Sequence, residues 1–472
     1  MGEEAVNAPR LLSERQYYHG LMLTEDAEEL LQASGKDGDF LLRAAWRPVA
    51  TGLWPVKLSL VVSLRWGGAL HHKVMGVDEA GNFSLGSPEQ LTFANVRELV
   101  QNYWLSAATE DGCAVVPLRE FSDATLRRPV GPAAWELDAA RIRRDGHTDA
   151  APLSAERSRG RVGQDLYRAQ LHSAGAPPTS VVVKSFIVQG SMETLNMCRR
   201  LRLRCRHENI VRLLGVCTRA ADDRRCLLVL EAAHNGALTT FLREKARPKL
   251  HEQTDEGRRL AALQRRFAVD AARALAHLGS QQVLHLGVAA HNCLVTTASE
   301  GPGQQRLLLA GFGSSRDGPV YRPTETTGRD EQQPQPVDDV RWAAPELLSA
   351  EIVGREATHK SDVWSWAVLC WEIGNCCAET PYGGWLAPSS VVETRLPETS
   401  SRQKLRQLLQ AGKRLETPKC FAEENGSCWA EMLSASWETD SAKRPNAADI
   451  VDALASSVPK TSDTDVSTAK AQ

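Results

Sequence analysis

The sequence predicts an α+β protein that folds as more than one domain. Its 472 residues exceed what one ordinary hydrophobic core organises. Both kinds of secondary structure are indicated. Residues 40–43 and 181–184 are short, mostly apolar runs typical of buried strands, whereas residues 259–278 carry apolar side chains at helical spacing. The 42% of hydrophobic and 24% of charged residues are typical of globular domains.

Charge and hydropathy exclude several classes of function. The formal net charge is −2, so we expect no nucleic-acid partner. No apolar run approaches the roughly 18 residues that a membrane span needs, and the start lacks a signal-peptide core. The 11 cysteines are scattered and mostly lie in apolar runs, which is typical of reduced thiols. We therefore expect a cytoplasmic protein without a membrane span.

The N-terminal part contains one compact pattern. Tyr-His-Gly at 18–20 precedes an amphipathic helix with Thr24 as the candidate N-cap. Phe-Leu-Leu-Arg at 40–43 then places Arg43 in an otherwise apolar strand. A buried arginine is costly unless an anionic group meets it, so Arg43 is a candidate anion-binding residue.

This pattern resembles an SH2 domain, whose signature strand reads F-L-V-R, and the resemblance covers residues 16–118. It implies a central antiparallel sheet flanked by two helices. It also implies that Arg43 binds phosphotyrosine in a bidentate manner, with His71 and Lys73 lining the ring and the phosphate. Tyrosine-phosphorylated proteins are the partners implied. The first-helix Arg and the hydroxyl-rich loop common in the family are replaced, so a fold kept only for docking is the alternative.

Residues 119–151 are interpreted as a linker, because Pro, Gly, Ala and Arg are frequent there and no period is evident. Trp-Glu-Leu at 135–137 is expected to dock onto the following domain, as the corresponding segment does in relatives. Residues 1–15 form a short polar N-terminal segment. Residues 458–472 are rich in Ser, Thr, Asp and Lys, which predicts a disordered tail.

A second region, residues 152–457, contains a series of motifs in a fixed order. They are Val-Val-Val-Lys at 181–184, His-Glu-Asn-Ile-Val at 207–211, a loop from His285 to Asn292, Ala-Gly-Phe-Gly at 310–313, Arg-Trp-Ala-Ala-Pro-Glu at 341–346 and Lys-Ser-Asp-Val-Trp-Ser at 360–365. This series resembles a bilobal tyrosine-kinase-like domain. The order of SH2 domain, linker and kinase-like domain resembles the cytoplasmic tyrosine kinases of the Fes/Fer type.

The resemblance implies two groups of residues in this region. Those of the nucleotide site are Gly160, Gly163, Lys184 and Asn292. Those that support the fold are His285, Phe312, Glu346, Asp362 and Arg444, with a buried ion pair expected between Glu346 and Arg444. Tyr321 lies in a polar segment that resembles an activation loop, and it is a candidate phosphorylation site.

The groups that perform phosphoryl transfer are replaced. Gly287 stands where the motif has the catalytic Asp, and Gly311 stands where a second Asp holds the metal ion. Cys198 occupies the helix position of the ion-pairing Glu, and Asp165 replaces the apolar residue that packs on adenine. No catalytic residue of the family is therefore expected to be intact, and no metal site is expected.

We interpret the chain as a phosphotyrosine-signalling pseudokinase that acts as an adaptor or scaffold through its SH2 domain. An active kinase would be a further partner. No cofactor is expected, and ATP with Mg²⁺ would bind only if the nucleotide site is retained. The alternative is an active protein-tyrosine kinase with non-standard catalytic residues, such as Glu300 or Asp317.

Overall fold

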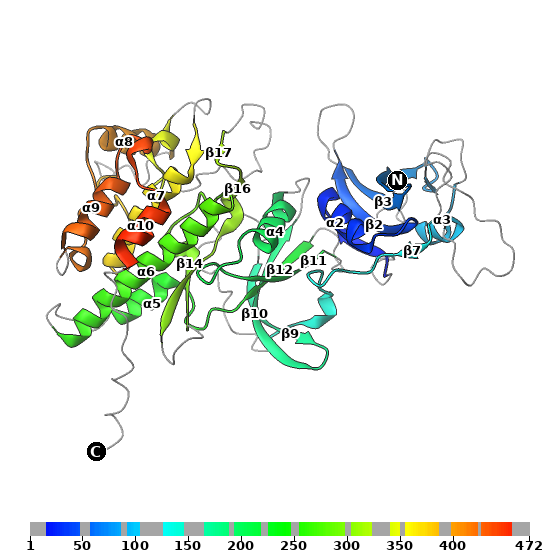
Figure 1. The fold of residues 1–472 in the computed structure, drawn as a ribbon, viewed down its shortest axis with the longest axis horizontal. Helices are drawn as coiled ribbons and strands as arrows, with labels where there is room; N and C mark the ends of the chain where they lie inside the picture. Colours follow the sequence, from blue (N-terminus) through cyan, green and yellow to red (C-terminus); the bar gives the residue numbers. More distant parts are fainter. Residues whose placement is uncertain are drawn as a thin grey trace, which may run out of the picture. The chain divides into compact units, whose positions relative to one another are not determined.

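A computed structural model describes the larger part of the chain. The described residues are 16–47, 57–85, 92–103, 126–145, 165–187, 193–218, 225–246, 254–297, 304–322, 340–349, 355–386, 398–422 and 426–455. They divide into two compact units (Figure 1). The N-terminal unit comprises Met1–Arg199 with Leu213–Ala232, and the C-terminal unit comprises Arg200–Arg212 with Ala233–Gln472. The predicted N-terminal segment and C-terminal tail lie outside the described residues.

The first part of the N-terminal unit is a sheet with two helices, as the sequence predicts. The strands follow the order β1 (Tyr18–Leu21), β2 (Asp39–Arg47), β3 (Lys57–Trp66) and β4 (Ala69–Val74), and β7 (Arg128–Pro129) also pairs with β2. The pairs β2–β3 and β3–β4 are antiparallel, whereas β1 and β7 run parallel to β2. The remaining elements are α2 (Thr24–Ser34), α3 (Val96–Tyr103) and the short pair β5 (Gly76–Val77) and β6 (Phe83–Ser84).

Helix α2 covers this sheet through an apolar face. Ala27 and Leu31 of α2 pack with Met22 and with Leu41 of β2 in one buried cluster. Thr24 is the first residue of the helix and not its N-cap, which is Leu23. The Thr24 hydroxyl instead accepts a hydrogen bond from Arg43, because the helix starts directly beside that guanidinium.

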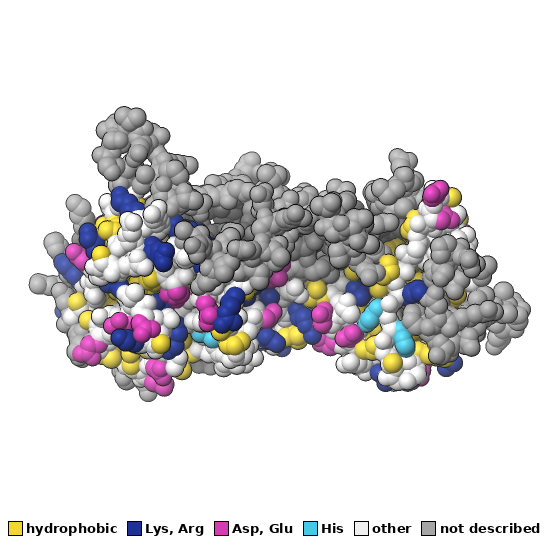
Figure 2. Space-filling view, turned by 90° about the horizontal axis from the view of Figure 1, so that it is seen from above, with side chains coloured by type: hydrophobic (Ala, Val, Ile, Leu, Met, Phe, Trp, Pro, Cys, Tyr) yellow, Lys and Arg dark blue, Asp and Glu magenta, His cyan; other side chains and the backbone are white. Residues whose placement is uncertain are grey.

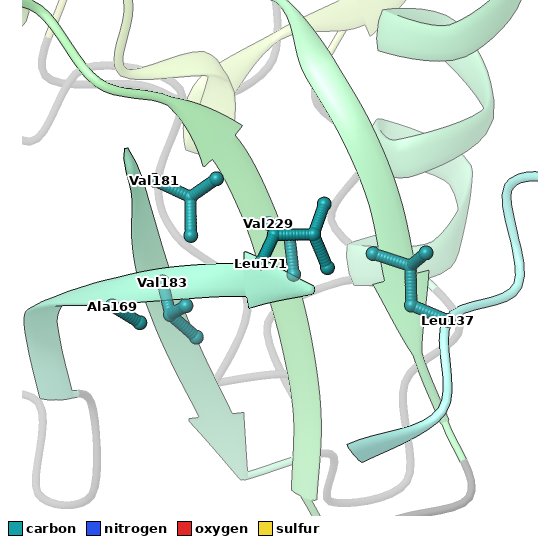
Figure 3. Close-up of a cluster of buried hydrophobic side chains, with 6 residues drawn as sticks. All are labelled: Leu137, Ala169, Leu171, Val181, Val183 and Val229. Carbon is teal, nitrogen blue, oxygen red and sulfur yellow. The ribbon is translucent and has the colours of Figure 1, made fainter. Parts of the chain in front are cut away.

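The second part of the N-terminal unit is a separate antiparallel sheet. Its strands follow the order β11 (Leu213–Cys217), β12 (Arg225–Glu231), β10 (Ala176–Ile187), β9 (Asp165–Ser173) and β8 (Ile142–Arg144), and α4 (Glu193–Leu203) precedes β11 in the chain. Figure 3 shows the apolar cluster on this sheet, formed by Leu137, Ala169, Leu171, Val181, Val183 and Val229. Five of these residues come from the strands, and Leu137 comes from the segment before β8.

The segment 126–145, expected to be a linker, contributes to both sheets. It supplies β7 to the first sheet and β8 to the second. Trp135 packs against the cluster under α2, and Leu137 belongs to the cluster of Figure 3. Between them, the Glu136 carboxylate accepts a hydrogen bond from His19 Nδ1 at 2.8 Å, and both side chains are buried. The segment is therefore part of the folded N-terminal unit.

The C-terminal unit is mainly helical. Its helices are α5 (Leu238–Lys245), α6 (Asp255–Ser280), α7 (His359–Gly374), α8 (Glu398–Gln410), α9 (Gly426–Ser436) and α10 (Ala447–Leu454). Helix α6 contains the predicted amphipathic stretch, and Thr254 caps it by accepting a hydrogen bond from Gly257 N. Helix α7 is buried along almost its whole length, and α6 packs against both α7 and α10 (Figure 1).

Among the described residues of the C-terminal unit, three short strand pairs flank the loops that contain the predicted kinase motifs. They are β13 (Val283–Leu284) with β16 (Arg316–Asp317), β14 (Cys293–Thr297) with β15 (Gln305–Leu309), and β17 (Val320–Tyr321) with β18 (Ala357–Thr358).

The surface carries both signs of charge. On the face visible in Figure 2, acidic and basic side chains are interspersed, as the small net charge predicts. Among the helices that the structure describes, none is both long enough and apolar enough to cross a bilayer.

Candidate functional site

Arg43 of β2 is 3% exposed, and the group of side chains around its guanidinium, Thr24, Ser63 and His72, is called the recess. It is held by β3, by α2 and by Met22, which lies between β1 and α2. Its Nε donates to Ser63 Oγ of β3 at 3.1 Å, and one terminal nitrogen donates to the Met22 carbonyl at 3.1 Å. The other terminal nitrogen donates to Thr24 Oγ1 of α2 at 3.0 Å. These contacts fix the plane of the guanidinium, which is the requirement for bidentate binding of an oxyanion.

The structure places His72 beside Arg43, on the face opposite to the predicted His71 and Lys73. His72 is paired with Ser63 across β3 and β4, and its Nδ1 lies 2.9 Å from Ser63 Oγ. Because side chains alternate along a strand, His71 and Lys73 lie on the other face of β4. Of the three residues predicted for phosphotyrosine, only Arg43 therefore lies in this recess.

An acidic side chain completes the recess. Glu28 of α2 lies with Oε1 3.2 Å from His72 Nε2, so one chain of contacts connects Glu28, His72, Ser63 and Arg43. Burial lowers the pKa of His72 below its ordinary 6.5, and the nearby Arg43 acts in the same direction, whereas the Glu28 contact acts against it. Sequence reasoning missed both His72 and Glu28.

In the C-terminal unit, the loop after β13 keeps the scaffold of a kinase catalytic loop. Asp362, near the start of α7, accepts hydrogen bonds from the backbone N–H groups of His285 and Leu286, both at 2.8 Å. His285 Nε2 donates to the Ala310 carbonyl at 2.9 Å. Burial raises the pKa of Asp362 to about 6 and lowers the pKa of His285 to about 4, so neutral His285 is the form that fits this site.

Asn292 occupies the space between the two glycines at the catalytic positions. Its Nδ2 donates to the Gly287 carbonyl at 2.7 Å. A Cβ added at Gly287 would lie 3.4 Å from that nitrogen, at the edge of ordinary contact. A Cβ added at Gly311 would clash with Asn292 Cγ, and Gly311 has a φ of +81°, which disfavours other residues. The Asn292 amide thus stands where a Gly311 side chain would start.

The segment after Gly311 packs against His285 and forms an ion pair with Arg200. The Phe312 ring meets the His285 ring edge-on with centroids 4.7 Å apart. Asp317 lies with Oδ2 2.9 Å from a terminal nitrogen of Arg200 and with Oδ1 3.1 Å from one of Arg204. Arg200 is buried and also donates to the Ser315 carbonyl. Asp317, one of the two alternative catalytic carboxylates, is therefore engaged in an ion pair, and Glu300 lies outside the described residues.

The predicted pair of Glu346 and Arg444 is present. The two terminal nitrogens of Arg444 donate to the two carboxylate oxygens of Glu346, each at 2.8 Å. The Arg444 side chain is fully buried, and its guanidinium also lies over the Trp364 ring. Ser361 of α7 donates to the same carboxylate.

The nucleotide-site residues of the N-terminal unit are described only in part. Lys184 lies in the middle of β10, with its ammonium 4.8 Å from the centre of the Phe186 ring. Cys198 on α4 is buried, and its thiol, together with burial, raises the pKa of Cys226 of β12. Gly160 and Gly163, and the side chain of Asp165, lie outside the described residues.

Tyr321, the candidate phosphorylation site, lies on β17. It is half-buried, and the Arg316 guanidinium lies over its ring. Leu286 stands at the Arg position of the catalytic loop, so this position has no positive charge that could pair with a phosphate on Tyr321.

Comparison with known families identifies the class of protein that this fold and this loop define. The model of the protein tyrosine and serine/threonine kinase family matches residues 156–454, and the SH2 domain model matches residues 17–103. Because the first match covers well over half of the chain, the chain belongs to the protein tyrosine and serine/threonine kinase family and carries an SH2 domain. Kinase domains of this family usually use ATP and Mg²⁺.

Individual relatives are Fer-related non-receptor tyrosine kinases, to which the chain is homologous. Fer-related kinase 1 of Caenorhabditis elegans is 28% identical over 376 residues, which are 78% of this chain and 79% of the relative. Tyrosine-protein kinase Fer of Homo sapiens is 26% identical over 442 residues, which are 92% of this chain and 43% of the relative. The transforming protein Fps of Fujinami sarcoma virus is 28% identical, and the chain covers 40% of it. The chain thus spans less than half the length of the last two.

Proposed function

We propose that this chain is a cytoplasmic phosphotyrosine-dependent adaptor whose kinase-like domain does not transfer phosphate. The observation that carries the proposal is the contrast between two sites. The SH2 recess keeps a buried, fully oriented Arg43, whereas the catalytic loop has glycine at both positions where the reaction needs a carboxylate. Tyrosine-phosphorylated proteins are the partners, and an active tyrosine kinase that supplies them is a further one.

The residues at the catalytic loop do not fit the magnesium site of a phosphotransferase. Mg²⁺ requires oxygen ligands in octahedral arrangement, usually with one or two carboxylates. Gly311 supplies no carboxylate, and the Asn292 amide uses its nitrogen on the Gly287 carbonyl. Among the residues that the structure describes, no three His, Cys, Asp or Glu side chains form a group that could hold a metal ion.

The retained motifs have a structural explanation. Asp362 holds the loop backbone, His285 and Phe312 pack on each other, and Glu346 pairs with Arg444. Each of these contacts stabilises the fold without needing a nucleotide. This supports a kinase-like domain that is kept as a binding surface, with Tyr321 as a residue that a partner kinase could phosphorylate.

A phosphotransfer assay tests the proposal. The purified chain is incubated with radiolabelled ATP and a tyrosine copolymer, with magnesium and separately with manganese. We expect incorporation equal to that of Lys184→Met, which removes the family's phosphate-pairing lysine. Incorporation clearly above this blank would favour the alternative, an active kinase with non-standard catalytic residues.

A nucleotide titration examines the cofactor separately. Thermal shift with ATP is measured with and without magnesium, because a retained nucleotide site could hold ATP even where the metal ligands are lost. We expect no additional stabilisation from magnesium. A magnesium-dependent increase of the melting temperature would show that other residues supply metal ligands.

A further inference from the structure

The chain of contacts from Glu28 to Arg43 fixes the direction of each hydrogen bond in the SH2 recess. An ionised carboxylate can only accept, so Glu28 receives the proton on His72 Nε2. Neutral His72 then has an unprotonated Nδ1, which accepts from the Ser63 hydroxyl. Ser63 in turn accepts from Arg43 Nε through its lone pairs. In this arrangement neither His72 nor Ser63 has a proton left for a further acceptor.

This arrangement disfavours an incoming phosphate. A phosphotyrosine phosphate carries between one and a half and two negative charges at neutral pH, by ordinary phosphate chemistry, with a second pKa of about 6. Arg43 attracts it, but Glu28, which is connected to Arg43 through His72 and Ser63, is a second anion near the same guanidinium, and like charges repel. The Glu28 side chain is 40% exposed and that of His72 is 22% exposed, so solvent reaches the pair.

Protonation of His72 reverses the arrangement. The added proton sits on Nδ1, which then donates to Ser63 Oγ, a hydroxyl that is itself fully buried. The imidazolium also offsets the charge of Glu28. We propose that the Glu28–His72 pair gates this recess: phosphotyrosine binds weakly while Glu28 holds neutral His72, and it binds more tightly once His72 takes up a proton. This inference rests on the proposed phosphotyrosine-binding function.

The charged groups around His72 also predict that phosphotyrosine affinity rises as the pH falls. Besides Glu28 from α2, the charged or titratable groups that act on it are Arg43 from β2 and His71, its neighbour along β4. In the unliganded domain, burial and these two basic groups lower the pKa of His72, so it is neutral at pH 7.5. A bound phosphate raises that pKa, and linkage then requires that affinity rises as the pH falls.

The experiment measures affinity as a function of pH with the full chain. The probe is a fluorescein-labelled pool of phosphotyrosine hexapeptides with degenerate flanking positions, read by anisotropy between pH 8.0 and 6.5, with the unphosphorylated pool as the blank. For the wild type we expect affinity to increase by about three- to tenfold over this range, since one unit of pKa difference is a factor of ten. Titration of the ligand itself is common to all variants and cancels in the comparison.

Two variants and two matched controls isolate the gate. Glu28→Gln should bind about two- to fivefold more tightly than the wild type at pH 8.0, the range expected for one partly exposed charge. His72→Gln should lose the additional pH dependence. Glu25→Gln removes the same charge from an exposed position of α2, and His71→Gln removes the adjacent histidine on the other face of β4. Glu25→Gln should behave as the wild type. His71→Gln should keep the additional pH dependence, although the loss of this neighbouring basic group removes part of what lowers the pKa of His72.

The outcomes separate the gate from the function on which it rests. If the wild type binds no phosphorylated pool above the blank at any pH, the proposed function fails, and the gate fails with it. If the wild type binds but has the same pH profile as His72→Gln, only the gate is overturned. Equal affinities of Glu28→Gln and the wild type at pH 8.0 would also overturn it. Glu28 is partly exposed, so that variant is expected to fold even if His72→Gln does not.

Discussion

The SH2 recess retains the charged residue of its family motif, whereas the catalytic loop retains only the residues that support the loop. In the recess the charged group, Arg43, remains, while the residues around it depart from the family pattern. In the catalytic loop the surroundings remain, with His285 and Asp362 in place, while both charged groups have become glycine. A buried charge is costly and persists only where something uses it or pairs with it. The comparison is what motivates the proposal that the chain binds an anion at Arg43 and transfers no phosphate at the catalytic loop.

The largest expected effect tests whether the kinase scaffold is intact. Glu346→Ala would leave the buried Arg444 without its carboxylate, so we expect the C-terminal unit to lose about 3–5 kcal/mol of unfolding free energy. Denaturant unfolding followed by tryptophan fluorescence measures this loss. Glu356→Ala is the matched control, because its pair with Arg322 is largely exposed. A similar midpoint for both variants would show that the scaffold does not depend on the buried pair.

The second effect concerns His285 and pH. Its folded pKa of about 4 lies below the ordinary 6.5, so its contribution to stability is complete above pH 6.5 and is lost as the pH falls toward 4. The difference in unfolding free energy between the wild type and His285→Asn should therefore shrink by about 3 kcal/mol between pH 7 and pH 4. Asp270 and Asp362, whose pKa values burial raises to about 6, act in the opposite direction in both proteins and cancel.

Urea titrations at several pH values give this difference directly. His277→Asn, which replaces a histidine that is only partly buried, serves as the control. A gap between the wild type and His285→Asn that does not change with pH would mean that His285 has the same pKa in the folded and the unfolded protein.

The third effect tests whether Arg43 in the SH2 recess binds phosphotyrosine. Arg43→Lys keeps the charge but loses the planar fork, so phosphopeptide affinity should fall by about 100-fold, the loss of one or two charge-assisted hydrogen bonds. Calorimetry with a phosphotyrosine peptide selected on the wild type measures it. Arg128→Lys, which changes an arginine paired with Asp39 in the same sheet, should leave affinity unchanged. Equal affinities of Arg43→Lys and the wild type would make the recess as vestigial as the catalytic loop.

The smallest effect concerns the space beside Asn292. Gly311→Ala should destabilise the C-terminal unit by about 1–2 kcal/mol, because it adds a Cβ against Asn292 at a positive φ. Gly313→Ala should change little, since nothing lies within 4 Å of a Cβ at that position. Thermal unfolding of the two variants side by side provides the measurement. No difference between them would show that Asn292 moves aside readily, and that a carboxylate restored at 311 would fit.

The sequence predicted the scaffold well, because the contacts that hold it are tied to motifs with fixed spacing. The Glu346–Arg444 pair and the helix that begins near Asp362 were both recognisable from residue type and order. The recess was predicted less completely. His71 and His72 are adjacent and chemically identical, and only the register of β4 against β3 decides which one faces Arg43.

Two contacts between segments that are far apart in the chain could not be predicted from the sequence pattern. Glu28 reaches a histidine 44 positions away, and Arg200 reaches Asp317 across 117 positions. Neither pair belongs to a local period, so no spacing rule indicates them. The position of Asn292 against Gly311 was missed for a related reason: the motif predicts that Asn292 is present, but not that its amide occupies the space a missing side chain leaves.

The segment 126–145 has a consequence for how the chain can be divided. A cut before residue 126 would remove β7 from the SH2 sheet together with the Arg128–Asp39 ion pair, and it would strand His19 without Glu136. A cut after residue 137 would instead take Leu137 from the other sheet. Fragments made at either place would expose apolar side chains that the intact chain covers. A protease that cleaves here should therefore destabilise both sheets. The N-terminal unit therefore cannot be divided into stable fragments by a cut between its two sheets.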